Sequence, residues 1–382
     1  MFATLSLVGL AGRGLSEMPV DVSSVSDFSR MFFQQGQYNE PIGYWDTRSA
    51  TTMASMFEEA GRFNQPLEAW DTSKVVTFQR MFYRAVAFNA AVLGWDTSSA
   101  TTLSGMFEYA YKFNSPVGEW DTSSVVSCSK VFQNALVFNQ PIEDWDTSKV
   151  VTFVEMFAGT QYFNQPLRGI ANTKILAPPG WNTSSATEMY RMFAYTRSFN
   201  QPLEDWDVSK VKGFSFMFTE SRVFNQPLEG WKTSSATHMD SMFSGARVFA
   251  QELKGWDVGN VVDFNNMFDG SRMRDEAVVG GKGFGRACRL HHSWKAQTPV
   301  WDPVAAGLMA NVNNLDLSVC APHLADALPP PPSPPPCPTH YQWAATTSSC
   351  SAHRTRSTSA WAMARCWRKA PSRRGRAGTS AR

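Results

Sequence analysis

The stretch Trp70-Asp71-Thr72-Ser73-Lys74-Val75 decides the fold, because close versions of it recur along most of the chain. A tryptophan opens nine versions, and every interval between them but one is 25 residues. The nine are Trp45, Trp70, Trp95, Trp120, Trp145, Trp181, Trp206, Trp231 and Trp256. A fixed period of this length indicates a repeat array, in which each unit is too small to bury its own apolar face and packs on its neighbours.

Within one repeat, the apolar residues predict a short helix. Val75, Phe78 and Phe82 follow the i, i+3, i+7 spacing of one helix face. Asp71 and the two residues after it have the side chains that cap a first helical turn, so the helix is expected to begin near residue 73. Pro66 excludes a preceding helix and makes the Leu-x-x-Trp piece extended. One repeat is therefore expected to be a short strand, a capped helix and a turn.

Stacking such repeats predicts the overall architecture. Strands about 4.8 Å apart would form a parallel sheet on one face, while helices about 10 Å wide would crowd the other face and curve the array. We therefore expect an α/β repeat solenoid, a leucine-rich-repeat-like horseshoe of ten 25-residue strand–helix units, over residues 20–274 with an insertion at 168–180. The tryptophan, phenylalanine and methionine columns are expected to form its core.

These motifs resemble a known family. Phe63-Asn64-Gln65-Pro66-Leu67, followed by Trp70-Asp71-Thr72-Ser73 and Met81-Phe82, is similar to the BspA-like leucine-rich-repeat family, also described as the unknown-function repeat of mycoplasma surface lipoproteins. The resemblance covers about residues 20–273. It implies a leucine-rich-repeat-like solenoid on surface-exposed or secreted proteins used in adhesion and protein binding. The family has no catalytic residues to transfer to this chain.

Two polar columns invite structural interpretations. An asparagine follows the aromatic residue in most repeats, as at Asn64 and Asn89, and is expected to form a ladder that satisfies backbone groups of the neighbouring repeat. An aspartate follows most of the tryptophans, as at Asp71. Stacked carboxylates could share calcium, but Lys232 in the same column would expel a cation, so helix capping is the favoured interpretation.

Variable residues between the leucine and tryptophan columns are the candidate binding site. Such variable positions on a fixed scaffold are where repeat proteins place recognition, and here they are mostly acidic. The candidate partner-binding residues are Glu68, Glu119, Glu143, Asp144, Glu204 and Asp205, aided by the 168–180 insertion. An acidic strip on the inner face would select a basic protein or surface macromolecule. A solvated charged surface without a partner is the competing interpretation.

The two ends of the chain lack the repeat. Residues 1–19 contain the apolar run Phe2–Leu10 and are interpreted as a leader or a truncated segment, with both alternatives open. No run reaches the ~18 apolar residues of a membrane helix, so no membrane span is expected. Residues 275–382 form a basic, proline-rich tail that is expected to be mostly disordered.

The tail also holds the weak metal candidates. Cysteine and histidine three residues apart can ligate zinc, as at Cys337 with His340 and at Cys350 with His353. Their irregular spacing beside a proline run favours coincidence, so no metal site is predicted. Clustered arginines at the end of the tail have too few interleaved tryptophans to predict nucleic-acid binding.

The sequence thus predicts a non-enzymatic, monomeric interaction protein, without a cofactor, that binds a macromolecule through the curved solenoid face. Extracellular or cell-surface localisation follows from the family resemblance. A cytoplasmic scaffold is the alternative, consistent with unpaired cysteines. An enzyme is disfavoured because the repeats contain a single histidine, His238, and no Ser/His/Asp constellation.

Overall fold

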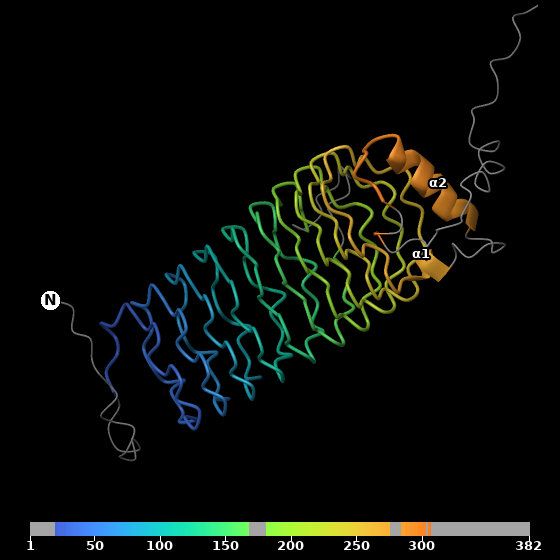
Figure 1. Ribbon diagram of the computed structural model, residues 1–382. Coiled ribbons are helices and arrows are strands. Elements are labelled where there is room, and N and C mark those ends of the chain that lie inside the picture. Colours follow the sequence, from blue (N-terminus) through green and yellow to red (C-terminus); the bar gives the residue numbers. More distant parts are fainter. Residues whose placement is uncertain (1–19, 168–180, 276–283, 303–304, 307–382) are drawn as a thin grey trace, which may run out of the picture. The chain divides into compact units, whose positions relative to one another are not determined.

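A computed structural model describes residues 20–167, 181–275, 284–302 and 305–306 of the chain (Figure 1). The chain divides into two units, residues 1–328 and 329–382, and every described residue lies in the first. Two helices are present among the described residues: α1, Arg272–Asp275, and α2, Phe284–Lys295. All other described residues form turns, bends, single bridges and irregular backbone.

The repeats stack in sequence order, each beside the next (Figure 1). Nine isolated parallel bridges connect ten successive repeats. The bridged residues are Asp27, Thr52, Thr77, Thr102, Ser127, Thr152, Glu188, Gly213, His238 and Asp263. The bridge between Thr152 and Glu188 keeps the register across residues 168–180, so the insertion does not interrupt the stack. The predicted number of ten repeats agrees with these bridges.

The predicted helix in each repeat is not formed. Within the segment 79–84, the backbone N–H groups of residues 80–84 alternate between two kinds of acceptor instead of bonding four residues back. Met81 N–H donates to the Phe78 carbonyl three residues before it, at 3.0 Å, which closes a tight turn. Arg80 N–H donates to the Ser104 carbonyl of the next repeat, at 2.9 Å. About half of the N–H groups that would bond within a helix therefore bond to the neighbouring repeat instead.

Backbone conformation at Arg80 and Arg84 confirms that the segment consists of turns. Both residues have φ of 55°, while helical residues require φ near −60°. A positive φ at the third residue of a hydrogen-bonded turn is typical of type II geometry. Glycine relieves this conformation in a few repeats, as at Gly105, where φ is 66°. The apolar spacing that suggested a helix is produced here by successive three-residue turns.

The spacing between repeats explains why helices are excluded. Ring centroids of Phe57 and Phe82 lie 5.4 Å apart, and those of Trp70 and Trp95 lie 6.4 Å apart. Helices packed side by side need 8–10 Å between their axes. Repeats that are close enough for aromatic stacking on every side leave no room for one helix per repeat. The expected α/β repeat solenoid, a leucine-rich-repeat-like horseshoe of strand–helix units, is therefore wrong.

The predicted strand is also replaced by a turn. Trp70 N–H donates to the Leu67 carbonyl at 3.1 Å, so Glu68 and Ala69 occupy the two central positions of a tight turn. The same bond closes the corresponding turn of other repeats, as between Trp145 and Ile142. No strand longer than a single bridge residue occurs in residues 20–167 and 181–275.

The core columns are placed as the sequence predicts. Met81, Phe82 and Trp145 are fully buried, and each aromatic column stacks along the array. The indole N–H of Trp95 donates to the carbonyl of Leu67 in the preceding repeat at 2.9 Å. Seven further tryptophans make the same bond. These eight tryptophans therefore satisfy their polar atoms within the core, whereas the buried indole N–H of Trp45, in the first of the nine tryptophan positions, has no partner among the described residues.

Helix α2 covers the last repeat, which the sequence did not predict. Its residue Trp294 is fully buried and stacks on Trp256, with ring centroids 6.2 Å apart. Gln297 accepts a hydrogen bond from Val258 N–H at 2.7 Å. Ala306 accepts one from Phe268 N–H at 2.8 Å, as the next repeat would. Order therefore extends beyond residue 274, over 284–302, whereas the rest of the tail lies outside the described residues.

Residues 284–302 and 305–306, which cover the last repeat, are called the α2 cap. A histidine of α2 holds the end of this cap in place. The indole N–H of Trp301 donates to Nδ1 of His291 at 3.1 Å, and both side chains are buried. Because an indole N–H can only donate, Nδ1 of His291 must be unprotonated. Burial lowers the pKa of His291 below its usual value, and His292 and Lys295 lower it further while Asp302 opposes them. The cap thus depends on neutral His291.

Replacing a core tryptophan should destabilise the stack much more than replacing a turn carboxylate. Trp145→Ala opens a cavity and removes an indole hydrogen bond, so it should cost roughly 3–5 kcal/mol. Glu143→Ala lies two residues away on an exposed turn and should change stability by less than about 0.5 kcal/mol. Urea denaturation of the full chain, followed by tryptophan fluorescence, measures both. Equal losses would show that the core and surface columns are misassigned.

Acidification should loosen the α2 cap. An imidazole with a depressed folded pKa stabilises the fold fully above the unfolded pKa of about 6.5, and this stability is lost as pH falls from there through the folded pKa. Amide hydrogen exchange in α2 should therefore accelerate between pH 7.5 and 5, after correction for intrinsic exchange. His291→Gln keeps an acceptor that does not titrate, and should remove this acceleration. The same pH response in both proteins would contradict the role of His291.

Candidate functional site

The six candidate carboxylates share one structural position. Glu68, Glu119, Glu143, Asp144, Glu204 and Asp205 all lie in the turn between the leucine and tryptophan columns, and all are exposed. We call this set the acidic turn row. Buried residues fix both ends of each turn, as Ile142 and Trp145 do around Glu143 and Asp144. The turn therefore holds its two central side chains outward from a rigid base.

The row runs along the stack, not along the concave face of a sheet. No sheet face exists in the described repeats, so the predicted inner strip is corrected to a line of turns. Glu119 belongs to the repeat directly before Glu143 and Asp144, and the three carboxylates share the same turn of adjacent repeats. None of the six forms a hydrogen bond or ion pair with another described residue. Exposed carboxylates in this arrangement can attract a cationic surface.

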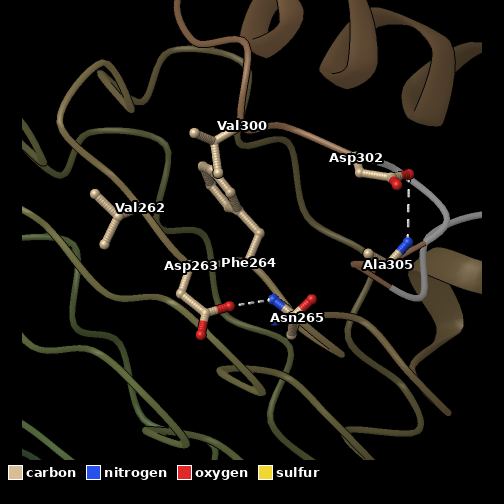
Figure 2. A pocket seen from close by; sticks show the side chains of 7 residues that line it. All are labelled: Val262, Asp263, Phe264, Asn265, Val300, Asp302 and Ala305. Atoms are coloured by element: carbon tan, nitrogen blue, oxygen red, sulfur yellow. Dashed lines mark hydrogen bonds between the residues drawn. The ribbon is translucent and has the colours of Figure 1, made fainter.

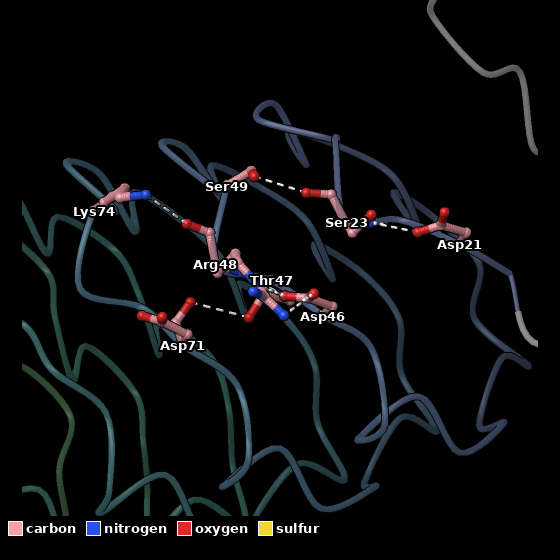
Figure 3. A network of polar contacts seen from close by, with 8 residues as sticks. All are labelled: Asp21, Ser23, Asp46, Thr47, Arg48, Ser49, Asp71 and Lys74. Carbon is pink, nitrogen blue, oxygen red and sulfur yellow. Dashed lines mark hydrogen bonds and ion pairs between the residues drawn. The ribbon is translucent and has the colours of Figure 1, made fainter.

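The aspartates that follow the tryptophans close local turns and do not cap helices. Asp71 Oδ1 accepts hydrogen bonds from the backbone N–H of Ser73 at 3.0 Å and from its hydroxyl at 2.6 Å. These bonds, the hydroxyl first, lower the pKa of Asp71. Asp46 makes the corresponding turn and pairs with Arg48 at 2.7 Å, as Figure 3 shows. Each aspartate thus closes a local turn, and the predicted helix capping is corrected accordingly.

Hydrogen bonds between repeats surround this column. Thr47 Oγ1 donates to the Asp71 carbonyl at 3.0 Å, and Lys74 donates to the Arg48 carbonyl at 3.1 Å (Figure 3). Ser49 donates in the same way to the Ser23 carbonyl. These side chains connect consecutive repeats and are committed to the fold.

The predicted asparagine ladder is confirmed. Asn89 Oδ1 accepts a hydrogen bond from the backbone N–H of Asn114 at 2.7 Å, and Asn64 does the same for Asn89. Eight such bonds run along the stack from Asn39 to Ala250. The column is therefore structural.

A mixed cluster of charged and aromatic side chains on the 79–84 turns was not predicted. Arg80 pairs with Glu58 at 2.7 Å and lies over the Tyr83 ring at 3.9 Å. Two repeats further along, Lys130 pairs with Glu155 of the following repeat at 3.1 Å. Opposite charges face each other in neighbouring repeats, so the cluster is largely neutralised within the fold. Local spacing in the sequence could not predict these pairs, because the paired residues are separated by 22–25 residues and become neighbours only in the stack.

Glu108 is the buried carboxylate of this cluster. Its side chain is almost fully buried, and burial raises its pKa, while the nearby charges of Lys130 and Arg80 oppose the rise. The shifted pKa is thus explained by packing.

A cavity of about 80 Å³ lies where the last repeat meets residues 300–305 (Figure 2). Asp263 and Asp302 line it, and each accepts a backbone hydrogen bond, from Asn265 N–H at 2.8 Å and Ala305 N–H at 3.4 Å. Ligand sites commonly measure about 300–1,000 Å³, so this cavity has room for only a few waters.

The described residues contain neither a metal-binding cluster nor a membrane-spanning helix. No group of three or more His, Cys, Asp or Glu side chains is arranged to hold a metal ion in the described part of the chain. Cys337, His340, Cys350, His353 and the 168–180 insertion lie outside that part. Cys128 is buried, which raises its pKa to about 12. Neither described helix has the length and hydropathy needed to cross a membrane.

Residues 18–101, 88–178 and 170–279 match the family described as Mycoplasma protein of unknown function, DUF285. The three matches together cover more than half of the chain. The chain belongs to the DUF285 family. The DUF285 matches end before α2, so the cap lies beyond the family region. No curated protein and no solved structure matches the chain.

Removing one asparagine of the ladder should weaken the stack. Asn89→Ala leaves the Asn114 backbone N–H without its acceptor and should cost about 1–3 kcal/mol. Asn89→Asp retains a carboxylate oxygen at the same position and should cost less. Both variants can be compared by urea denaturation of the full chain. An alanine variant as stable as wild type would show that the ladder is not needed.

Proposed function

We propose that the protein is a non-enzymatic binding protein that recognises a macromolecular partner through the acidic turn row. The observation that carries this proposal is the contrast between the row and the other columns. Aromatic residues fill the core, Asn89 and its equivalents satisfy backbone donors, and Asp71 and its equivalents close turns. The six carboxylates of the row do none of these tasks, and the residue type at these turn positions varies from repeat to repeat.

The chemistry of the row favours a basic partner. Glu143 and Asp144 stand side by side on one turn, with Glu119 at the same turn of the preceding repeat. Exposed carboxylates held in adjacent repeats produce a local negative potential that attracts cationic side chains. Because these groups are exposed to solvent, the attraction should weaken as salt is added.

Membership of a repeat family whose description refers to mycoplasma proteins is compatible with a more specific assignment. We propose a BspA-like role in adhesion, with the protein located at the cell surface or outside the cell. The outward exposure of all six carboxylates of the acidic turn row suits contact with a large surface. The same row would serve an adhesive contact without any cofactor.

The test is capture of a partner by the full chain. Wild-type protein is compared with a variant in which the six carboxylates of the row become the corresponding amides, which keeps side-chain size and removes charge. Extracts of cell surface and extracellular matrix supply the candidate partners, which are identified by mass spectrometry. Wild type should retain a basic macromolecule that salt elutes, and the variant should retain at least about tenfold less, since six exposed charged contacts worth roughly 0.3 kcal/mol or more each together exceed the ~1.4 kcal/mol of a tenfold change.

A matched control separates the row from general charge effects. Glu119→Gln, Glu143→Gln and Asp144→Asn remove three charges from the row. Asp27→Asn, Glu40→Gln and Glu188→Gln remove three charges elsewhere on the repeats. Only the first set should reduce capture. Equal capture by wild type and both variants, with the same dependence on salt, would show that recognition takes place elsewhere.

A further inference from the structure

Four arginines occupy one position of four consecutive repeats. Arg197, Arg222, Arg247 and Arg272 follow one another at intervals of 25 residues and lie two residues before the phenylalanine column or its equivalent. All four are exposed. We call them the arginine row. Arg197, Arg222 and Arg247 lie on the turn that follows the equivalents of residues 79–84, and Arg272 begins α1, so the row is distinct from the acidic turn row.

The fold does not require arginine at this position. The six preceding repeats place uncharged residues there, namely Gly36, Gly61, Val86, Tyr111, Leu136 and Gln161. Those repeats form the same turn and the same aromatic stacks. The positive charge at this position is therefore confined to one end of the stack, and the turn of the other repeats forms without it.

The stack brings the arginines close together. Phe199, Phe224 and Phe249, two residues after three of them, have ring centroids 6.1 Å apart in successive repeats. Like charges on neighbouring repeats repel one another, which costs stability unless an anion lies along them. Arg222 pairs with Glu220 at 3.2 Å, and its side chain remains 44% exposed. Arg197 and Arg247 form no ion pair with any described residue.

We propose that the arginine row binds a linear acidic polysaccharide laid along the stack, with one carboxylate or sulfate group for each repeat. Guanidinium groups present a planar set of donors that matches a carboxylate or sulfate with two parallel hydrogen bonds. Acidic sugar units of an extended chain succeed one another at a spacing comparable to that of the repeats. The exposed Val223 and Val248 beside the arginines offer an apolar surface for the sugar rings.

Surrounding residues favour a polysaccharide over a single-stranded nucleic acid. Binding of single strands without sequence preference depends on aromatic side chains on which successive bases stack. Two residues before the arginines stand Tyr195, Glu220 and Gly245, so one aromatic ring accompanies the row and a carboxylate follows it. A row of phosphates with its bases would find no regular stacking platform here. This site goes beyond the proposed function and does not depend on it, because different residues and opposite charge are involved.

The experiment uses the full chain and three probes: alginate oligomers, neutral dextran of similar length and a single-stranded oligothymidylate. One variant carries Arg197→Gln, Arg222→Gln and Arg247→Gln. Its control carries Lys74→Gln, Lys149→Gln and Lys210→Gln, which removes three exposed positive charges from another column of the repeats. Affinities are measured by calorimetry, and thermal denaturation checks that both variants fold. The rate at which phenylglyoxal modifies each arginine, read by peptide mass spectrometry, reports contact locally.

Alginate should bind wild type and slow modification of Arg197, Arg222 and Arg247, whereas dextran should do neither. The arginine variant should bind alginate at least about tenfold more weakly, since three charge-assisted contacts are lost, and the lysine control should stay within about twofold. Equal losses in both variants, or unchanged modification rates with alginate present, would overturn the proposal. Tighter binding of the oligothymidylate, with protection of the same arginines, would overturn it in favour of a nucleic acid.

Discussion

Everything else in the structure depends on the close contact between neighbouring repeats. Most indoles stack on the next at about 6 Å, as Trp70 does on Trp95, and eight of them donate their N–H to a carbonyl of the preceding repeat. This double constraint fixes both the distance and the register of the stack. At this distance a helix in every repeat is too wide to fit. Backbone donors such as Arg80 N–H therefore bond to the neighbouring repeat. The turns follow from this requirement, including the positive φ angles at non-glycine residues.

The sequence predicted what depends on repetition alone. The count of ten repeats, the burial of columns such as Trp145 and Phe82, and the asparagine ladder all follow from identical residues recurring at one period. The secondary structure could not be predicted in this way. Apolar residues at Val75, Phe78 and Phe82 fit a helix face and a series of tight turns equally well, and only the distance between repeats distinguishes them. Local spacing contains no information on that distance. The cap was missed for a different reason, since Trp294 occupies the tryptophan position from a helix that breaks the period.

The surface divides into columns that hold the fold together and columns that do not. Asp71 and Asn89 recur because their oxygens satisfy backbone donors. The sequence identified the exposed carboxylates of the acidic turn row, and the structure moves them from a concave sheet to a line of turns. It did not reveal the charge pairs between Arg80 and Glu58, because the two residues become neighbours only through stacking. The arginine row emerges from the same comparison, since its charges lie where other repeats have Gly36 or Val86. Comparing the same position among the repeats thus shows which residues the fold requires, because a residue that only some repeats carry is not required by the fold.

The hydrogen bond of Arg80 N–H tests the central claim most directly. Trans-hydrogen-bond scalar couplings, measured by transverse-relaxation-optimised NMR on deuterated, isotope-labelled full-length protein, identify the carbonyl that each amide contacts. A stack of turns predicts a coupling between the Arg80 nitrogen and the Ser104 carbonyl carbon of the next repeat, together with a positive φ at Arg80. A coupling to the Val76 carbonyl, four residues earlier, with a negative φ, would show a helix in the repeat and contradict the account.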